Sequence, residues 1–167
     1  LSLVGSEMCI RDRGWIRAIG VSNFYPDRLV DLCSFVEVKP AINQVETHIF
    51  QQQTAAHEYM EKYGVQHESW GPFAEGRKDF FTNPVLNEIG KKHDKSAAQV
   101  ALRFLLQSDV VVIPKSTHKE RMEENINVFD FALDASDMNA IRALDEKESL
   151  FFSHYDPAIA EMMIKLH

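Results

Sequence analysis

This sequence of 167 residues lacks long apolar runs, cysteines at metal-binding or redox spacing, and an excess of positive charge. No stretch approaches the roughly 18 apolar residues of a membrane-spanning helix, so we expect no membrane partner. The two cysteines, Cys9 and Cys33, have neither metal-binding nor redox spacing, which fits a reducing cytoplasm. The formal net charge is −7. Because a protein that coats nucleic acid is normally basic, we expect no nucleic-acid partner.

The composition that remains is that of an ordinary globular protein. Hydrophobic residues make up 45% and charged residues 26% of the chain. This balance excludes a disordered tail, a collagen-like fibre and a disulfide-stapled miniprotein. The length is also that of one domain, for which about 100–200 residues are usual.

Residues 1–13, LSLVGSEMCIRDR, differ from the rest of the sequence. They lack the basic start and the small-residue cleavage site of a signal peptide. The string resembles the translated read-through of a sequencing adapter, although a real N-terminal helix end of low complexity is the alternative. We expect residues 1–13 to be a non-native or disordered leader and residues 14–167 to form the folded part.

Short apolar runs that alternate with helical patterns predict an α/β fold with parallel strands. The runs cover residues 16–21, 41–45, 64–69 and 110–114. Helix starts are predicted at Pro26, Asn83-Pro84, Ser96, Asp134 and a Thr117-x-x-Glu120 capping box.

Two architectures fit four such strands: half of a (β/α)8 TIM barrel, or a small open doubly wound sheet. The last run ends in Pro114-Lys115-Ser116, directly before a helix. Barrels often bind phosphate at a helix N-terminus after their last strands, which favours the barrel. No G-x-G-x-x-G motif follows any strand, so the usual Rossmann fingerprint is absent from the sequence.

Four segments carry a resemblance to a known family: IRAIGVSNF, PAINQVE, SWGPFAEG and IPKSTHKERMEEN. From Gly14 to about Leu150, the chain resembles the C-terminal half of an aldo/keto reductase, strands 5–8 of its barrel. The tail ESLFFSHYDP is similar to the bacterial subgroup of 2,5-diketo-gluconate reductases. The resemblance implies NADP as cofactor and a small-molecule carbonyl compound as substrate.

The resemblance also implies roles for individual residues. Ser22, Asn23 and Gln44 would hold the nicotinamide carboxamide, and Trp70 would stack on the nicotinamide ring, where the family more often has Tyr. Taken alone, Ser22-Asn23 is also common turn chemistry, Gln44 could be an ordinary internal amide, and Trp70 could be a core aromatic at the barrel rim. Phe151 and Phe152 would join Trp70 in one wall of the substrate site.

The phosphate groups of the cofactor involve a second set of residues. Gly71, Phe73 and Gly76 lie in the loop that lines the pyrophosphate in the family. Lys115, Ser116 and Arg121 match the positions that bind the adenosine 2′-phosphate, and Glu124 and Asn125 match those that read adenine. An ordinary solvated helix start is the other interpretation of this last cluster.

The family's catalytic Asp, Tyr, Lys and His come from the other half of the barrel, and no motif for them occurs here. We therefore expect the parent protein to reduce aldehydes or ketones with NADPH as a monomer or weak dimer, and this chain alone to be inactive. The histidines are scattered, so no metal site is expected. Two alternatives stay open: a noncatalytic NADP-sensing subunit, and a phosphate-binding fragment of an unrelated barrel.

Overall fold

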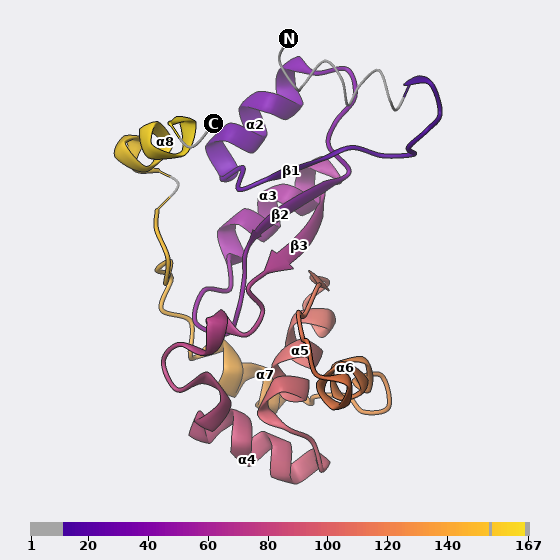
Figure 1. Ribbon diagram of the computed structural model, residues 1–167, viewed down its shortest axis with the longest axis vertical. Helices are drawn as coiled ribbons and strands as arrows, with labels where there is room; N and C mark the ends of the chain where they lie inside the picture. The colour runs from indigo at the N-terminus through magenta and orange to yellow at the C-terminus, as the bar shows by residue number, and fades with distance from the viewer. Residues whose placement is uncertain (1–11, 154, 166–167) are drawn as a thin grey trace. The chain divides into compact units, whose positions relative to one another are not determined.

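The computed structural model describes residues 12–153 and 155–165, which form four strands and a series of helices (Figure 1). The strands lie in one sheet in the order β1-β2-β3-β4. The elements are β1 (Gly20–Ser22), α2 (Pro26–Phe35), β2 (Ile42–Glu46), α3 (Thr54–Tyr63), β3 (Gln66–Trp70), the 3-10 turns η1 (Ala74–Gly76) and η2 (Phe80–Thr82), α4 (Pro84–His93), α5 (Ala97–Gln107), β4 (Val111–Val112), α6 (Lys119–Ile126), α7 (Ala135–Arg142) and α8 (Pro157–Ile164). The predicted α/β class with parallel strands is therefore confirmed.

The chain divides into two compact units, of which the first comprises Leu1–Val45 and Thr54–His67. Its strands β1 and β2 pair in parallel, with Gly20 opposite Ile42. A Cβ atom on Gly20 would lie 2.9 Å from the Ile42 carbonyl oxygen, so this close pairing requires glycine. Helices α2 and α3 pack against each other and bury Leu29 and Met60 in the core of the unit.

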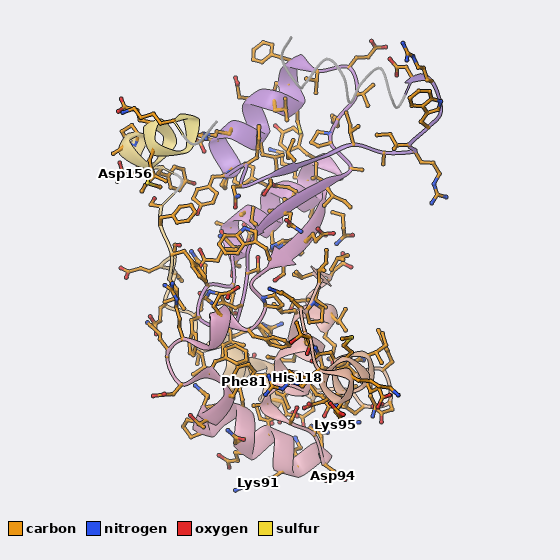
Figure 2. All side chains as sticks on the ribbon, in the orientation of Figure 1. Phe81, Lys91, Asp94, Lys95, His118 and Asp156 are labelled. Atoms are coloured by element: carbon orange, nitrogen blue, oxygen red, sulfur yellow. The ribbon has the colours of Figure 1, made fainter. Side chains whose placement is uncertain are left out.

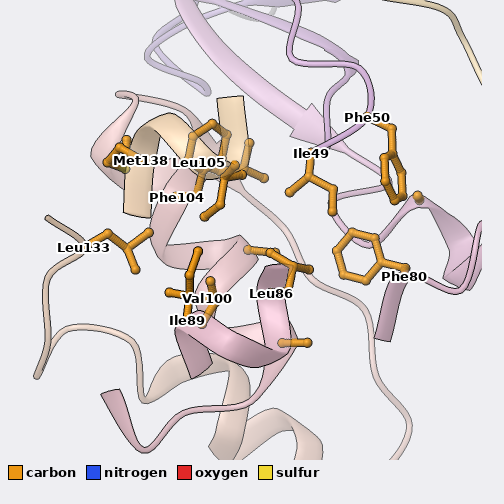
Figure 3. Packing of buried hydrophobic residues seen from close by; sticks show 14 of the residues in the cluster. Ile49, Phe50, Phe80, Leu86, Ile89, Val100, Phe104, Leu105, Leu133 and Met138 are labelled. Atoms are coloured by element: carbon orange, nitrogen blue, oxygen red, sulfur yellow. The ribbon is translucent and has the colours of Figure 1, made fainter. Parts of the chain in front are cut away.

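The second unit comprises Glu46–Gln53 and Glu68–His167. Strands β3 and β4 pair in parallel, with Glu68 opposite Val111. Its core gathers apolar side chains from α4, α5, α7 and the segment after β2 (Figure 3). On α5, Val100, Phe104 and Leu105 are buried, and their spacing places them on one face of the helix.

Three predicted helix starts in the second unit are confirmed by their caps. Asn83 accepts hydrogen bonds from the backbone N–H groups of Val85 and Leu86 at the start of α4. Ser96 and Asp134 each form a capping box at the start of α5 and α7. Each cap satisfies backbone donors that the helix itself leaves without partners.

The predicted Thr117-x-x-Glu120 capping box is wrong. Helix α6 has His118 as its N-cap and receives no side-chain capping bond there. The Ser116 hydroxyl instead accepts a hydrogen bond from the His118 N–H, at 3.1 Å. The turn before the helix thus uses a different hydroxyl, and the helix begins later than predicted.

An ionic contact joins α4 to α7. Lys92 Nζ lies 2.9 Å from Asp137 Oδ1, and His93 Nε2 lies 2.8 Å from Asp137 Oδ2. Burial raises the pKa of Asp137, but the hydrogen bonds from His93 and Lys92 outweigh burial and leave that pKa below its ordinary value. The contact therefore holds the C-terminal end of α4 against the first turn of α7.

Within the described residues, no helix is both long and apolar enough to cross a membrane.

Candidate functional site

The second unit contains a cavity of about 640 Å³ between the loop after β3, the start of α5 and the β4–α6 region. Phe81 and His118, both labelled in Figure 2, lie on its wall. Six of the expected cofactor residues line this cavity: Phe73, Lys115, Ser116, Arg121, Glu124 and Asn125. Residues widely separated in the sequence are thus brought together, as their predicted common role requires.

The apolar side of the cavity is supported by the hydrophobic core. The Phe73 and Phe81 rings have their centroids 5.9 Å and 5.2 Å from that of Phe80, which is fully buried. Such edge-on aromatic contacts restrict the orientation of the rings. The two phenylalanines on the cavity wall are therefore positioned by their contacts with the buried Phe80 ring.

The polar side of the cavity is held by helix caps. Gln99, part of the Ser96 capping box, donates hydrogen bonds from Nε2 to the carbonyl oxygens of Glu124 and Asn127, at 3.1 Å and 2.9 Å. The Glu124 carbonyl also accepts from the Asn127 N–H at 3.1 Å, so Gln99 adds a second donor at the C-terminal end of α6. One side chain at the start of α5 therefore fixes the helix that carries Arg121, Glu124 and Asn125.

Two cationic side chains, Lys115 and Arg121, line the cavity together with the carboxylate of Glu124. In the part of the chain that the structure describes, neither Lys115 nor Arg121 forms an ion pair, whereas Lys92 and Lys95 do. Exposed cations, the hydroxyl of Ser116 and the N-terminal end of α6 together favour an anion of high charge density, such as a phosphate monoester.

Three of the residues expected at the nicotinamide, Ser22, Asn23 and Gln44, lie in the first unit. Ser22 Oγ donates to the Gln44 carbonyl oxygen at 3.1 Å, and Asn23 Nδ2 donates to Ser22 Oγ at 3.0 Å. The backbone of Asn23 is left-handed, with φ of 59°, and its N–H donates to the same Gln44 oxygen. Ser22 is thus the last residue of β1 and Asn23 is the bend that follows it, and together they present a hydroxyl and an amide beside the end of β2.

Asn43 is a residue of this group to which the sequence assigned no role. It is fully buried, its Nδ2 donates to the Phe24 carbonyl oxygen at 2.6 Å, and its Oδ1 accepts from the Phe24 N–H at 3.2 Å. This pair of bonds fixes the backbone directly after Ser22-Asn23. The feature of the sequence that could have pointed to Asn43 is the presence of this polar residue in an otherwise apolar strand.

Trp70 ends β3 and contacts Phe151, with 5.2 Å between ring centroids. The Arg77 guanidinium lies 4.3 Å from the centroid of the Phe151 ring and also donates to the Leu150 carbonyl oxygen. Phe152, the residue that follows Phe151 in the sequence, is half-buried. Two of the three expected substrate residues are thus in direct contact.

Gly71 and Gly76 have positive φ, 64° and 72°. This backbone conformation favours glycine, whether or not a phosphate approaches, although Ala74 and Glu75 of the same loop also have positive φ, 52° and 53°. Neither lines the cavity, nor does Trp70.

A buried carboxylate, Glu46, joins the end of β2 to the C-terminal segment. Its oxygens accept hydrogen bonds from His48 Nε2 at 3.0 Å, from the Leu150 N–H at 2.9 Å and from Ser149 Oγ. Burial raises the pKa of Glu46, but these three donors outweigh burial and hold the pKa below its ordinary value. Glu46 therefore stays ionised, which its burial alone would oppose.

Two histidines of the first unit also form a pair. His57 Nδ1 and His67 Nδ1 lie 3.0 Å apart, and burial together with the charge of His57 lowers the pKa of His67 to about 3. Among the described residues, no group of three or more His, Cys, Asp or Glu side chains is placed to hold a metal ion.

Comparison with known proteins extends this description. The sequence model of the aldo/keto reductase family matches residues 9–146. Glyoxal reductase of Bacillus subtilis is 46% identical over 135 residues, which are 81% of this chain and 48% of that enzyme. The chain spans about half the length of the curated relatives it matches.

Solved structures agree with the sequence comparison. An aldo-keto reductase from a deep-sea metagenome library of the Medee basin superposes with a TM-score of 0.87 at 38% identity, covering 91% of this chain and 56% of that one. A variant of Gox0644 in complex with NADPH gives a TM-score of 0.83 at 37% identity, covering 89% of this chain and 54% of that one. Four parallel strands with intervening helices, a family match over residues 9–146 and these superpositions show that the chain belongs to the aldo/keto reductase family.

Proposed function

We propose that this chain is the cofactor-binding part of an NADP-dependent aldo/keto reductase, the whole of which reduces aldehydes or ketones to alcohols. The cavity lined by Lys115, Ser116 and Arg121 is the observation that carries the proposal. NADPH differs from NADH by one phosphate monoester, and this cavity offers that group two cations and a hydroxyl.

The donor set fits the adenosine end of NADP. An ammonium and a guanidinium form charge-assisted hydrogen bonds with a phosphate, and the guanidinium fork can bind two phosphate oxygens at once. Glu124 and Asn125, one turn further along α6, bring a carboxylate acceptor and an amide for the edge of adenine. The volume of the cavity also lies in the range of small-ligand sites.

The nicotinamide end would use Ser22, Asn23 and Gln44 of the first unit, together with Trp70 at the end of β3. Ser22, Asn23 and Gln44 supply the hydroxyl and amides that a carboxamide can bond, and Trp70 supplies a ring face for stacking. When bound, NADPH supplies the hydride. The chain's own residues hold the ring and limit which of its faces is open to substrate.

The same chain would contribute part of the substrate site. Trp70 and Phe151 form an aromatic surface on which the apolar part of a small carbonyl compound can pack. The proton donor would come from polypeptide outside residues 14–167, because no catalytic Asp, Tyr, Lys and His motif of the family occurs in them. In this proposal, the chain binds cofactor and does not itself complete the reaction.

The test has two parts. First, binding of NADPH and NADH to the 167-residue chain is measured, and tighter binding of NADPH is expected. Second, a full-length protein that carries this sequence is assayed for NADPH-dependent reduction of a panel of aldehydes. Turnover supports the reductase, and binding without turnover supports the noncatalytic NADP sensor. Equal affinity for NADPH and NADH would contradict the proposed phosphate site.

A further inference from the structure

The buried Glu46 carboxylate holds the backbone that carries Phe151, whose ring forms the aromatic surface with Trp70. Glu46 is only 1% exposed, and Glu46 and Ser149 are 103 residues apart in the sequence. A buried charge is costly unless it is fully hydrogen-bonded, so its position is strongly constrained by the donors around it. Those donors belong to the loop after β2 and to the C-terminal segment.

On one side, His48 fixes the carboxylate. The Phe50 N–H donates to His48 Nδ1 at 3.2 Å, so Nδ1 is an acceptor and the ring proton lies on Nε2. His48 Nε2 therefore donates to Glu46 Oε1, at 3.0 Å. His48 is itself fully buried, which leaves the pair little freedom to rearrange.

On the other side, Glu46 fixes the chain that carries Phe151. The Ser149 hydroxyl donates to Glu46 Oε2, and its oxygen then accepts from the N–H groups of Phe151 and Phe152, both at 3.1 Å. The Leu150 N–H donates directly to Glu46 Oε1 at 2.9 Å. Three consecutive backbone N–H groups are thus connected to one carboxylate, directly or through one hydroxyl.

This arrangement differs from a nucleophilic triad, although it contains the same residue types. The carboxylate lies between the serine and the histidine, and no hydrogen bond joins Ser149 to His48. His48 therefore cannot take the Ser149 proton as a general base, and the network serves to place backbone rather than to activate a hydroxyl.

We propose that Glu46 is a positioning residue, which sets the Trp70–Phe151 surface and through it the reductase's discrimination between carbonyl substrates of different size. The proposal rests on the function proposed above for this surface. Bulky apolar substrates need both rings in place, whereas a small aliphatic aldehyde makes little use of them. Loss of the network should thus affect bulky substrates selectively.

The first test uses tryptophan fluorescence and needs no catalysis. With Trp15→Phe, Trp70 is the remaining tryptophan of the chain, which contains two. In this background, Glu46→Gln preserves side-chain size but places an amide NH₂ against groups that donate. We expect Trp70 emission to shift to longer wavelength and acrylamide quenching to increase. Glu148→Gln is the matched control, because it makes the same change at an exposed carboxylate two residues before Leu150.

The second test uses a full-length protein that carries the sequence. Glu46→Gln should raise KM for an aromatic aldehyde about tenfold, the value of one hydrogen bond to a charged group, and leave KM for NADPH and for a small aliphatic aldehyde unchanged. A merely structural role would move all of these parameters together, and that result would overturn the proposal.

Ser149→Ala keeps the proposal testable if Glu46→Gln does not fold, as judged by circular dichroism. It removes only the hydroxyl between the carboxylate and the Phe151 and Phe152 N–H groups, and the same fluorescence shift is expected. Unchanged Trp70 fluorescence in folded variants overturns the positioning role. If the unsubstituted full-length protein reduces no carbonyl compound while the fluorescence still shifts, the proposed function fails and the structural coupling stands.

Discussion

Arg121→Ala is the substitution that separates a 2′-phosphate site from an ordinary helix start. Arg121 lines the cavity, is exposed, and forms no ion pair within the described residues. Its loss therefore breaks no ion pair of the described structure, and the expected effect on folding is small. If Arg121 binds the phosphate, its removal deletes a charge-assisted hydrogen bond. Because the site is open to solvent, the lower end of the range for such bonds applies, and we expect a loss of about tenfold in NADPH affinity.

The assay measures the dissociation constants of NADPH and NADH for the unsubstituted chain and for three variants. Arg121→Ala should weaken NADPH and leave NADH unchanged. Arg121→Lys should recover part of the loss, because it keeps the charge and loses the bidentate fork. Lys119→Ala is the control, since Lys119 is on the same helix but lies outside the cavity lining. Equal weakening of NADPH and NADH by Arg121→Ala would refute the assignment.

Three further predictions concern stability. The pKa of His67, lowered to about 3, lies below its unfolded value of about 6.5, so the unfolded state binds the proton first. The free energy of unfolding should be unaffected by His67 above pH 6.5 and fall by up to about 1.4 kcal/mol per pH unit below it, and His67→Gln should flatten that slope in denaturant titrations. Asn83→Ala should cost about 1 kcal/mol in chemical denaturation by removing the α4 cap, with the exposed Glu88→Ala as the near-neutral reference. Phe104→Ala should cost about 3–5 kcal/mol in the same assay, whereas a similar loss for Phe129→Ala, at a position 67% exposed, would show that burial is not the cause.

Local chemistry made much of this fold predictable. Caps at Asn83, Ser96 and Asp134 act within a few residues of the sequence, so the pattern of side chains alone shows where those helices begin. Thr117 shows the limit of that reasoning. Several hydroxyls were available near the start of α6, and the turn formed around Ser116 instead.

Contacts between distant residues account for most of what sequence reasoning missed. Nothing near Glu46 in the sequence indicates that its partners are Ser149 and Leu150, and nothing near His67 indicates its contact with His57. The cavity residues were found because a family resemblance supplied the spacing, not because local pattern did. Helix α8 was also missed, since its apolar residues follow a segment of mixed character without a clear cap.

The most direct test of the account is the affinity of the chain for adenosine 2′,5′-bisphosphate compared with adenosine 5′-monophosphate, measured by titration calorimetry. The two ligands differ only in the phosphate that Lys115, Ser116 and Arg121 are proposed to hold. We predict that the bisphosphate binds at least about tenfold more tightly, and that the difference decreases as salt screens the two cations. Equal affinity for the two ligands would contradict the central claim that this cavity recognises the 2′-phosphate of NADP.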